Sequence, residues 1–66
     1  MEELLTVKEV AKVLKVNPAC VYALRDSGRL RFLKLGSLKC RRSTLDQFIR
    51  DAEGYDLTDP EHVVEL

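Results

Sequence analysis

Apolar residues recur at helical spacing near the start of the chain. Intervals of three and four residues place four of them on one face of a helix over residues 7–14. These four are Val7, Val10, Ala11 and Leu14. Thr6 precedes this stretch and Glu9 follows three residues later, which is a capping-box pattern. The sequence therefore predicts a first amphipathic helix with a defined start.

A second helix is predicted directly afterwards, over residues 18–27. Asn17 and the proline that follows it place a capping residue before the residue type preferred at the first helical position. Val21 and Leu24 form its inner face, and Gly28 is the expected stop. Because only two residues separate the first helix from Asn17, the pair is predicted to form a helix-turn-helix.

The outward side of the second helix is where DNA bases would be contacted. Projection at 100° per residue places two alanines there, which offer only apolar contact to a thymine methyl group. Tyr22 and Arg25 are the best contacts available, although Tyr22 could instead pack on the first helix and Arg25 could be a solvated charge. The candidate recognition residues are Pro18, Ala19, Tyr22, Ala23 and Arg25.

A hairpin is predicted next, with strands over residues 30–35 and 38–42 joined by a two-residue Gly-Ser link. This link sets Lys34 opposite Lys39, a repulsive pair unless an anion lies between them. One face is then Leu33, Leu35, Leu38 and Cys40, and the other is Phe32, Lys34, Lys39 and Arg41. We interpret the charged face as a wing for DNA phosphates; alternatively, the lysines protect an exposed edge from aggregation.

A third helix is predicted over residues 44–53, capped by Ser43 and amphipathic at helical spacing. We therefore expect a mainly α-helical fold with a small β-hairpin, a winged helix-turn-helix of order α-α-β-β-α, over residues 1–54. The remaining residues, 55–66, are acidic and too few for a second domain, and we expect a flexible tail.

The chain has eleven basic and eleven acidic residues, but their distribution is uneven. Residues 8–42 hold ten Lys or Arg against two acids, a net charge of +8, whereas residues 43–66 hold one Arg against seven acids, a net charge of −6. This asymmetry indicates a basic face for duplex DNA; alternatively, the two halves attract each other on a solvated surface. Eight residues of the wing and its flanks are candidates for binding DNA. They are Lys8, Arg29, Arg31, Lys34, Ser37, Lys39, Arg41 and Arg42.

Length and composition argue against several other classes of protein. Sixty-six residues allow one small domain and leave little room for a deep substrate pocket, so an enzyme is not expected. Cys20 and Cys40 lack metal-ligand spacing and His62 is the only histidine, so we expect no cofactor, metal or small-molecule ligand. No apolar run is long enough to span a bilayer, and we expect a cytoplasmic protein with no membrane contact.

Residues 5–52 resemble the small MerR-like winged helix-turn-helix domains of the excisionase family. The matching pieces are LTVKEVAKVLKV at the start, VYAL in the second helix, SGRL after it, KLG at the hairpin turn and RRSTL before the last helix. The resemblance implies a DNA-binding protein of a bacterium or its mobile elements, acting at the nucleoid of the host. Some members direct excisive recombination beside an integrase, and others regulate transcription.

We therefore predict a DNA-binding accessory protein, an excisionase or recombination directionality factor that binds and bends duplex DNA. The alternative is a small transcriptional regulator that uses the same surface. The acidic tail is repelled by DNA and is predicted to contact a tyrosine integrase or a neighbouring copy of the protein; alternatively, it is a solvated end without a role. Its candidate contact residues are Tyr55, Asp56, Asp59, Glu61, Val63 and Val64.

Overall fold

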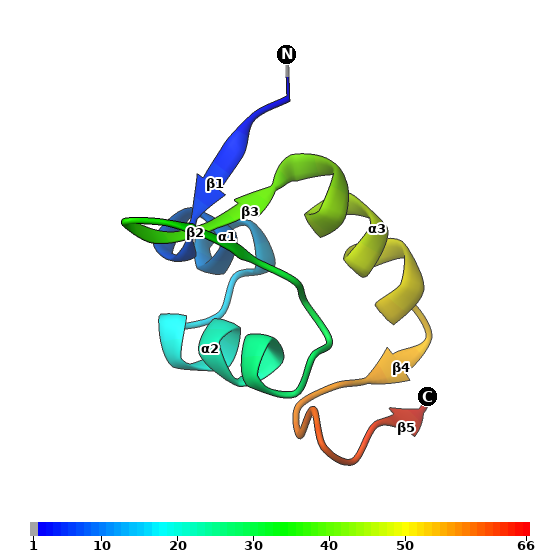
Figure 1. Ribbon diagram of the computed structural model, residues 1–66. Coiled ribbons are helices and arrows are strands. Elements are labelled where there is room, and N and C mark those ends of the chain that lie inside the picture. The colour runs from blue at the N-terminus through cyan, green and yellow to red at the C-terminus, as the bar shows by residue number, and fades with distance from the viewer. Residues whose placement is uncertain (1) are drawn as a thin grey trace.

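Three helices and five short strands make up the computed structural model, which describes residues 2–66 (Figure 1). The helices are α1 (Val7–Leu14), α2 (Pro18–Asp26) and α3 (Arg42–Ala52). The strands are β1 (Leu4–Thr6), β2 (Leu33–Leu35), β3 (Ser37–Arg41), β4 (Tyr55–Asp56) and β5 (Val64–Glu65). This is the predicted winged helix-turn-helix, with the β2–β3 hairpin as the wing. No helix in the described part is long and apolar enough to cross a membrane.

Both predicted starts of the helix-turn-helix are confirmed. The hydroxyl of Thr6 accepts a hydrogen bond from the backbone N–H of Glu9 at 3.1 Å, and the Glu9 carboxylate accepts one from the Thr6 N–H at 2.9 Å. These bonds complete a capping box and hold the pKa of Glu9 below its usual value. At the start of α2, the side-chain oxygen of Asn17 accepts from the N–H of Cys20 at 3.1 Å. The capping residues therefore fix where both helices begin.

The ends of α1 and α2 have the same backbone geometry with different residues. Lys15 closes α1 at φ 59°, and Gly28 follows α2 at φ 78°. After each of them, a backbone N–H donates to the carbonyl five residues earlier at 3.0 Å, which is the Schellman arrangement. Glycine adopts this left-handed conformation freely, whereas a side chain such as that of Lys15 costs about 1–2 kcal/mol. The inter-helix turn is therefore strained at Lys15.

One apolar core joins the helices, the three-stranded sheet and the loop between α2 and the wing. Its buried members are Leu5, Val7, Val10, Ala11, Val21, Leu24, Leu30, Cys40 and Leu45. Cys40 is a small core residue, as predicted, and burial raises the pKa of its thiol. The core therefore joins α2 to the sheet that carries the wing.

The predicted register of the wing is wrong by one residue. Gly36 alone makes the connection at φ +76°, and Ser37 already belongs to β3. Lys34 therefore lies opposite Leu38, and Leu33 opposite Lys39, so the predicted repulsive lysine pair does not form. A glycine in the left-handed region closes the turn in one residue, and this closure decides the register.

The corrected register also changes which side chains face the core. Leu5 of β1 lies opposite Cys40, and both are buried. Because side chains alternate along a strand, Leu38 shares this inner face, while Leu33 and Leu35 share the outer face with Lys39 and Arg41. Leu35, predicted to be a core residue, is 68% exposed.

Strand β1 and the true start of α3 are absent from the sequence-based prediction. β1 pairs with β3 in an antiparallel sheet of order β1-β3-β2. Helix α3 was expected to begin after Ser43, but it begins at Arg42, and Ser43 lies inside its first turn. The backbone N–H of Arg42 donates to the carbonyl of Glu3 at 3.0 Å, so the chain leading into β1 also determines where α3 starts.

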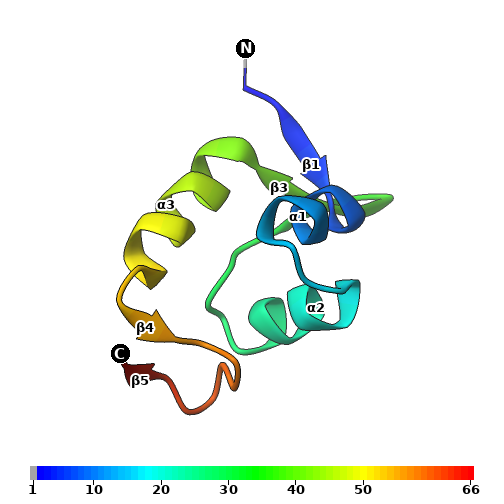
Figure 2. The same ribbon diagram turned by 180° about the vertical axis from the view of Figure 1, so that it is seen from behind.

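The segment predicted as a flexible tail is folded against the domain in the structure (Figure 2). β4 and β5 pair with each other in an antiparallel hairpin after α3. Leu57 packs against the core, Pro60 is buried, and the carbonyl of Pro60 accepts a hydrogen bond from Arg29 at 3.1 Å. These contacts connect the tail to the loop that follows α2.

Candidate nucleic-acid interface

The outward side of α2 is exposed, as the helical projection predicts. Val21 and Leu24 are turned into the core, with 0% and 4% of their surface exposed. The five candidate recognition residues are all solvent-exposed: Pro18, Ala19, Tyr22, Ala23 and Arg25. Two alanines and a proline make this surface smooth, so the backbone of α2 can approach a DNA groove closely.

Tyr22 and Arg25 form one unit on that surface. The guanidinium carbon of Arg25 lies 5.5 Å from the centroid of the Tyr22 ring, a cation–π distance. Two nitrogens of the same guanidinium donate to the Asp26 carboxylate at 2.9 Å and 2.7 Å. Tyr22 keeps 44% of its surface exposed. Arg25 is therefore held in place before any ligand arrives, with further N–H groups left to donate.

The wing and the loop before it carry cations that have no acidic partner among residues 2–66. Lys34 and Arg31 are exposed, and Lys39 is half-buried and donates a hydrogen bond to the hydroxyl of Ser37. Within residues 2–66 none of these three cations, nor Lys8 on α1, takes part in a salt bridge. An unpaired surface cation keeps its full capacity to neutralise a phosphate.

Three other predicted cations are bound by the protein itself. Arg41 pairs with Glu2 at 2.8 Å and Arg42 with Asp46 at 3.3 Å. Arg29 donates to the tail carbonyl and lines the cleft beneath the tail. The sequence offered no signal for the Arg41 and Arg29 contacts, because their partners lie 39 and 31 residues away.

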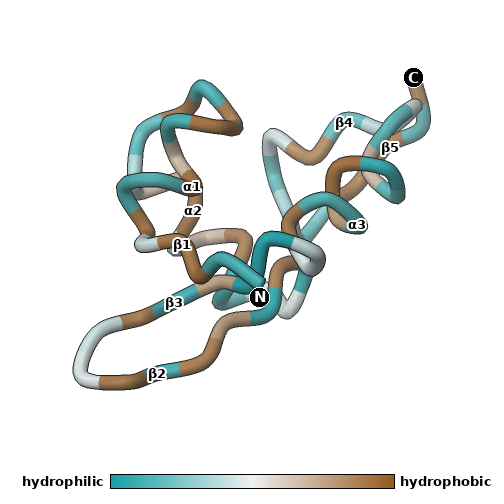
Figure 3. Tube along the Cα trace, turned by 90° about the horizontal axis from the view of Figure 1, so that it is seen from above, coloured by the Kyte–Doolittle hydropathy of each residue, from teal (hydrophilic) through white to brown (hydrophobic). Residues whose placement is uncertain are grey.

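The elements divide into two sides of the molecule. Figures 1 and 2 both place the wing turn and the beginning of α2 on one side, with α3, β4 and β5 on the other. Figure 3 shows the wing projecting away from the rest of the chain on the side of α1 and α2. The basic and acidic parts of the sequence therefore lie on different sides of the molecule. The wing cations are on one side and the acidic tail is on the other.

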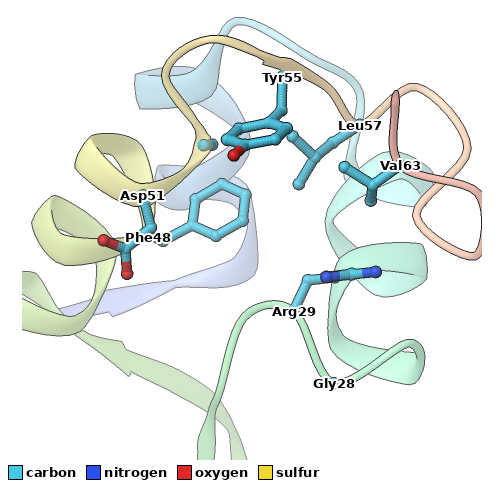
Figure 4. Close-up of a pocket in the computed structure, with 8 residues that line it drawn as sticks. Gly28, Arg29, Phe48, Asp51, Tyr55, Leu57 and Val63 are labelled. Atoms are coloured by element: carbon cyan, nitrogen blue, oxygen red, sulfur yellow. The ribbon is translucent and has the colours of Figure 1, made fainter. Parts of the chain in front are cut away.

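Two of the tail residues predicted to bind a partner, Tyr55 and Val63, line a cleft of about 450 Å³ (Figure 4). Phe48, Leu57 and Val63 supply its apolar lining, and Tyr55 and Arg29 lie on opposite sides of it. No local sequence pattern indicates this cleft, because its lining comes from the loop after α2, from α3 and from the tail. The other predicted tail contacts, Asp56, Asp59, Glu61 and Val64, are exposed.

Two of the tail acids stabilise the tail's own turns. Asp56 accepts hydrogen bonds from the hydroxyl and the backbone N–H of Thr58, which lower its pKa. Asp59 accepts from the ring of His62 and from the N–H of Glu61, and its pKa is lowered as well. These local bonds pre-form the loop between β4 and β5.

A family model described as a helix-turn-helix domain matches residues 4–53, and the chain belongs to that family. The matched span begins in β1 and ends after α3, so it contains the whole winged unit and leaves out the tail. No curated protein and no solved structure gives a significant match. Fold and family together define a helix-turn-helix protein of the DNA-binding class.

Proposed function

We propose that this protein is an accessory DNA-binding factor of the excisionase type, which binds and bends duplex DNA so that a recombinase can assemble. In this proposal α2 lies in the major groove and the wing lies along the neighbouring backbone. The observation that carries it is the contrast between the two surfaces: the α2 surface is poor in hydrogen-bonding groups, and the wing is rich in unpaired cations. Such a protein gains affinity mainly from phosphates and little from bases.

On α2, the expected contacts are the smooth Pro18–Ala19 start and the Tyr22–Arg25 unit. The positive end of the helix dipole lies at this start, where it favours a phosphate. Arg25 can exchange its bond with Asp26 for a phosphate or a guanine edge without leaving the Tyr22 ring. Only one strong base contact is then available per site. This limits discrimination to the lower end of the usual range, about 10³ over non-specific DNA.

On the wing and its flanks, we expect the unpaired cations to dominate. They are Lys8, Arg31, Lys34 and Lys39. Arg41 and Arg42 add to the local positive potential while they stay paired with acids. Arg29 contributes less, because its guanidinium is bonded toward the tail.

The tail is the proposed contact for a protein partner, a tyrosine integrase or a neighbouring copy. It lies on the side away from the wing, and its acids are repelled by DNA. Tyr55, which lines the cleft, and Val64 of β5 keep 46% and 61% of their surface exposed, and these side chains offer apolar anchors for a partner.

A salt titration tests the DNA part of the proposal. If about five to seven phosphates are neutralised, the logarithm of the binding constant should fall with the logarithm of salt at a slope of roughly −4 to −6. A slope near zero on duplex DNA would contradict it. DNA bending, measured by energy transfer between duplex ends, tests the architectural part. Strong discrimination between sequences without bending would instead favour the transcriptional regulator.

A further inference from the structure

The cleft beneath the tail is formed by segments that are distant in sequence. Arg29 comes from the loop after α2, Phe48 from α3, and Leu57 and Val63 from the tail. The cleft volume of about 450 Å³ falls within the range of small-ligand sites in proteins, roughly 300–1,000 Å³. The tail lies beyond the matched residues 4–53, so the complete cleft is not contained in the winged unit that the family model describes.

The walls of the cleft are mainly apolar. Phe48 and Leu57 pack against the core and also line the cleft. Figure 4 shows the rings of Phe48 and Tyr55 on one side of the space, with Leu57 and Val63 on the other. An aromatic group that fills this space would remove these side chains from water and contact two rings. The lining therefore fits a flat apolar body.

Arg29 supplies the positive charge of the cleft. Its Nε donates to the carbonyl of Pro60 at 3.1 Å, and within residues 2–66 its guanidinium takes part in no salt bridge. The terminal N–H groups of Arg29 are left to donate, in the planar fork that matches a carboxylate. Because the bond to Pro60 restricts the guanidinium before a ligand arrives, less entropy is lost on binding.

Asp51 is the acidic residue of the lining, and its carboxylate is bonded elsewhere. The side-chain N–H of Gln47 donates to this carboxylate at 2.8 Å. Figure 4 shows the carboxylate on the other side of Phe48 from Arg29. The charge of Arg29 is therefore not neutralised by Asp51, and the apolar space beside Arg29 favours an anionic ligand over a cationic one.

We propose that this cleft binds a small aromatic carboxylate. Its carboxylate accepts hydrogen bonds from the terminal nitrogens of Arg29, and its aromatic body lies among Phe48, Leu57 and Val63. Such a ligand contacts the winged unit and the tail together, so its binding strengthens the docking of the tail. This site goes beyond the proposed function and needs no DNA. The expectation of no small-molecule ligand came from residue spacing, which does not indicate a cleft formed by distant segments.

The probe is 2-naphthoate. It is compared with 2-naphthamide, which has the same aromatic body without the charge, and with 2-naphthylmethylamine, which is positively charged at neutral pH. Each compound is titrated into the full chain without DNA, and methyl signals are followed by NMR. Saturable shifts are expected for Leu57 and Val63, and none for Leu4 and Val13, which lie outside the cleft lining. 2-Naphthoate should bind about tenfold more tightly than 2-naphthamide, as expected for hydrogen bonds to a charged group, and the amine should bind least tightly.

Two variants test the role of Arg29. Arg29→Gln should remove the preference for 2-naphthoate and leave the affinity for 2-naphthamide nearly unchanged. Arg50→Gln removes the same charge from an exposed arginine of α3 outside the cleft lining, so it should keep the preference.

Three results would overturn the inference. The first is equal affinity of the unaltered chain for 2-naphthoate and 2-naphthamide. The second is a preference for 2-naphthoate that survives in Arg29→Gln, and the third is the absence of saturable shifts at Leu57 and Val63. The comparison of ligands on the unaltered chain holds even if a variant releases the tail.

Discussion

The carboxylate of Glu2 accepts a hydrogen bond from the backbone N–H of Ser43 at 2.8 Å, joining the start of the chain to the first turn of α3. The Ser43 hydroxyl donates to the same carboxylate, and Arg41 pairs with it at 2.8 Å. Helix α3 has no side-chain cap of its own, so Glu2 satisfies a free N–H at the positive end of the helix dipole. The bonds from Ser43, followed by that from Arg41, lower the pKa of Glu2 to about 2.

This contact predicts a pH-dependent contribution to stability. The carboxyl of Glu2 has a pKa of about 2 in the folded chain against an ordinary value of 4.5. Its contribution is therefore complete above pH 4.5 and is lost as the pH falls toward 2. Glu2→Gln should melt at a lower temperature than the unaltered chain at pH 7, and the gap should narrow between pH 4.5 and pH 2.

Thermal unfolding followed by circular dichroism at pH 7, 4.5 and 2.5 measures this gap. Glu3→Gln is the matched control, because the contact of Glu3 with α3 uses its backbone carbonyl. The same acids remain elsewhere in both chains, so their titration cancels in the comparison. A gap of equal size at pH 7 and pH 2.5 would contradict the assignment.

The register of the wing predicts that substitutions of two leucines close in sequence change the free energy of unfolding by very different amounts. Leu35→Asp places a charge in solvent and should change the free energy of unfolding by less than about 0.5 kcal/mol. Leu38→Asp places a charge against the core and should cost about 2 kcal/mol or more. Urea denaturation compares the two variants. The register expected from sequence would make both substitutions disruptive, so an unfolded Leu35→Asp would argue for that register.

The helix-turn-helix was predictable because its signals are local. The Thr6–Glu9 capping box and the Asn17 cap lie within three residues of the groups they bind, so the bounds of α1 and the start of α2 follow from sequence alone. The exposed side of α2 follows from the helical period. The start of α2 and its solvent-exposed side can therefore be predicted from the sequence.

The wing register, the start of α3 and the docking of the tail depend on contacts between residues that are distant in sequence. One dihedral angle at Gly36 sets the wing register, and the pairing of Leu5 with Cys40 fixes its inner face. Glu2 reaches Ser43 across 41 positions, and no local pattern indicates that bond. The same holds for the hydrogen bond from Arg29 to the tail, whose acceptor lies 31 residues further along the chain.

The strained turn between α1 and α2 predicts a stabilising substitution. Lys15→Gly removes the cost of a side chain at φ 59° but adds freedom to the unfolded chain, and the balance should stabilise the protein by about 0.5–1 kcal/mol. Gly28→Ala is the reverse test, because it introduces a side chain at φ 78°. No atom lies within 4 Å of the added Cβ, so its cost of about 1 kcal/mol would be conformational alone. Loss of stability in Lys15→Gly, measured by urea denaturation, would contradict the assigned turn.

The docked tail predicts the effect of ending the chain at Gly54. The winged unit matched by the family model stays intact, so the shortened chain should fold. It loses the Leu57 packing and the Arg29–Pro60 bond, and a net cost of about 1 kcal/mol would lower the melting temperature by about 4–8 °C. An unchanged melting temperature would show that the tail does not hold the domain together.

The same truncation separates docking from partner binding. Residues 55–66 carry four acids, so their removal should leave DNA affinity equal or raise it, while cooperative assembly with a tyrosine integrase or between neighbouring copies should fall. The matched control is the double variant Glu61→Gln, Glu65→Gln, which removes two charges from the tail and keeps both the Leu57 packing and the Arg29 bond. A gel-shift titration on duplexes with one and two sites measures both quantities. If the truncated chain assembles as cooperatively as the full chain, the tail has no partner in this proposal, and its role is limited to stabilising the domain.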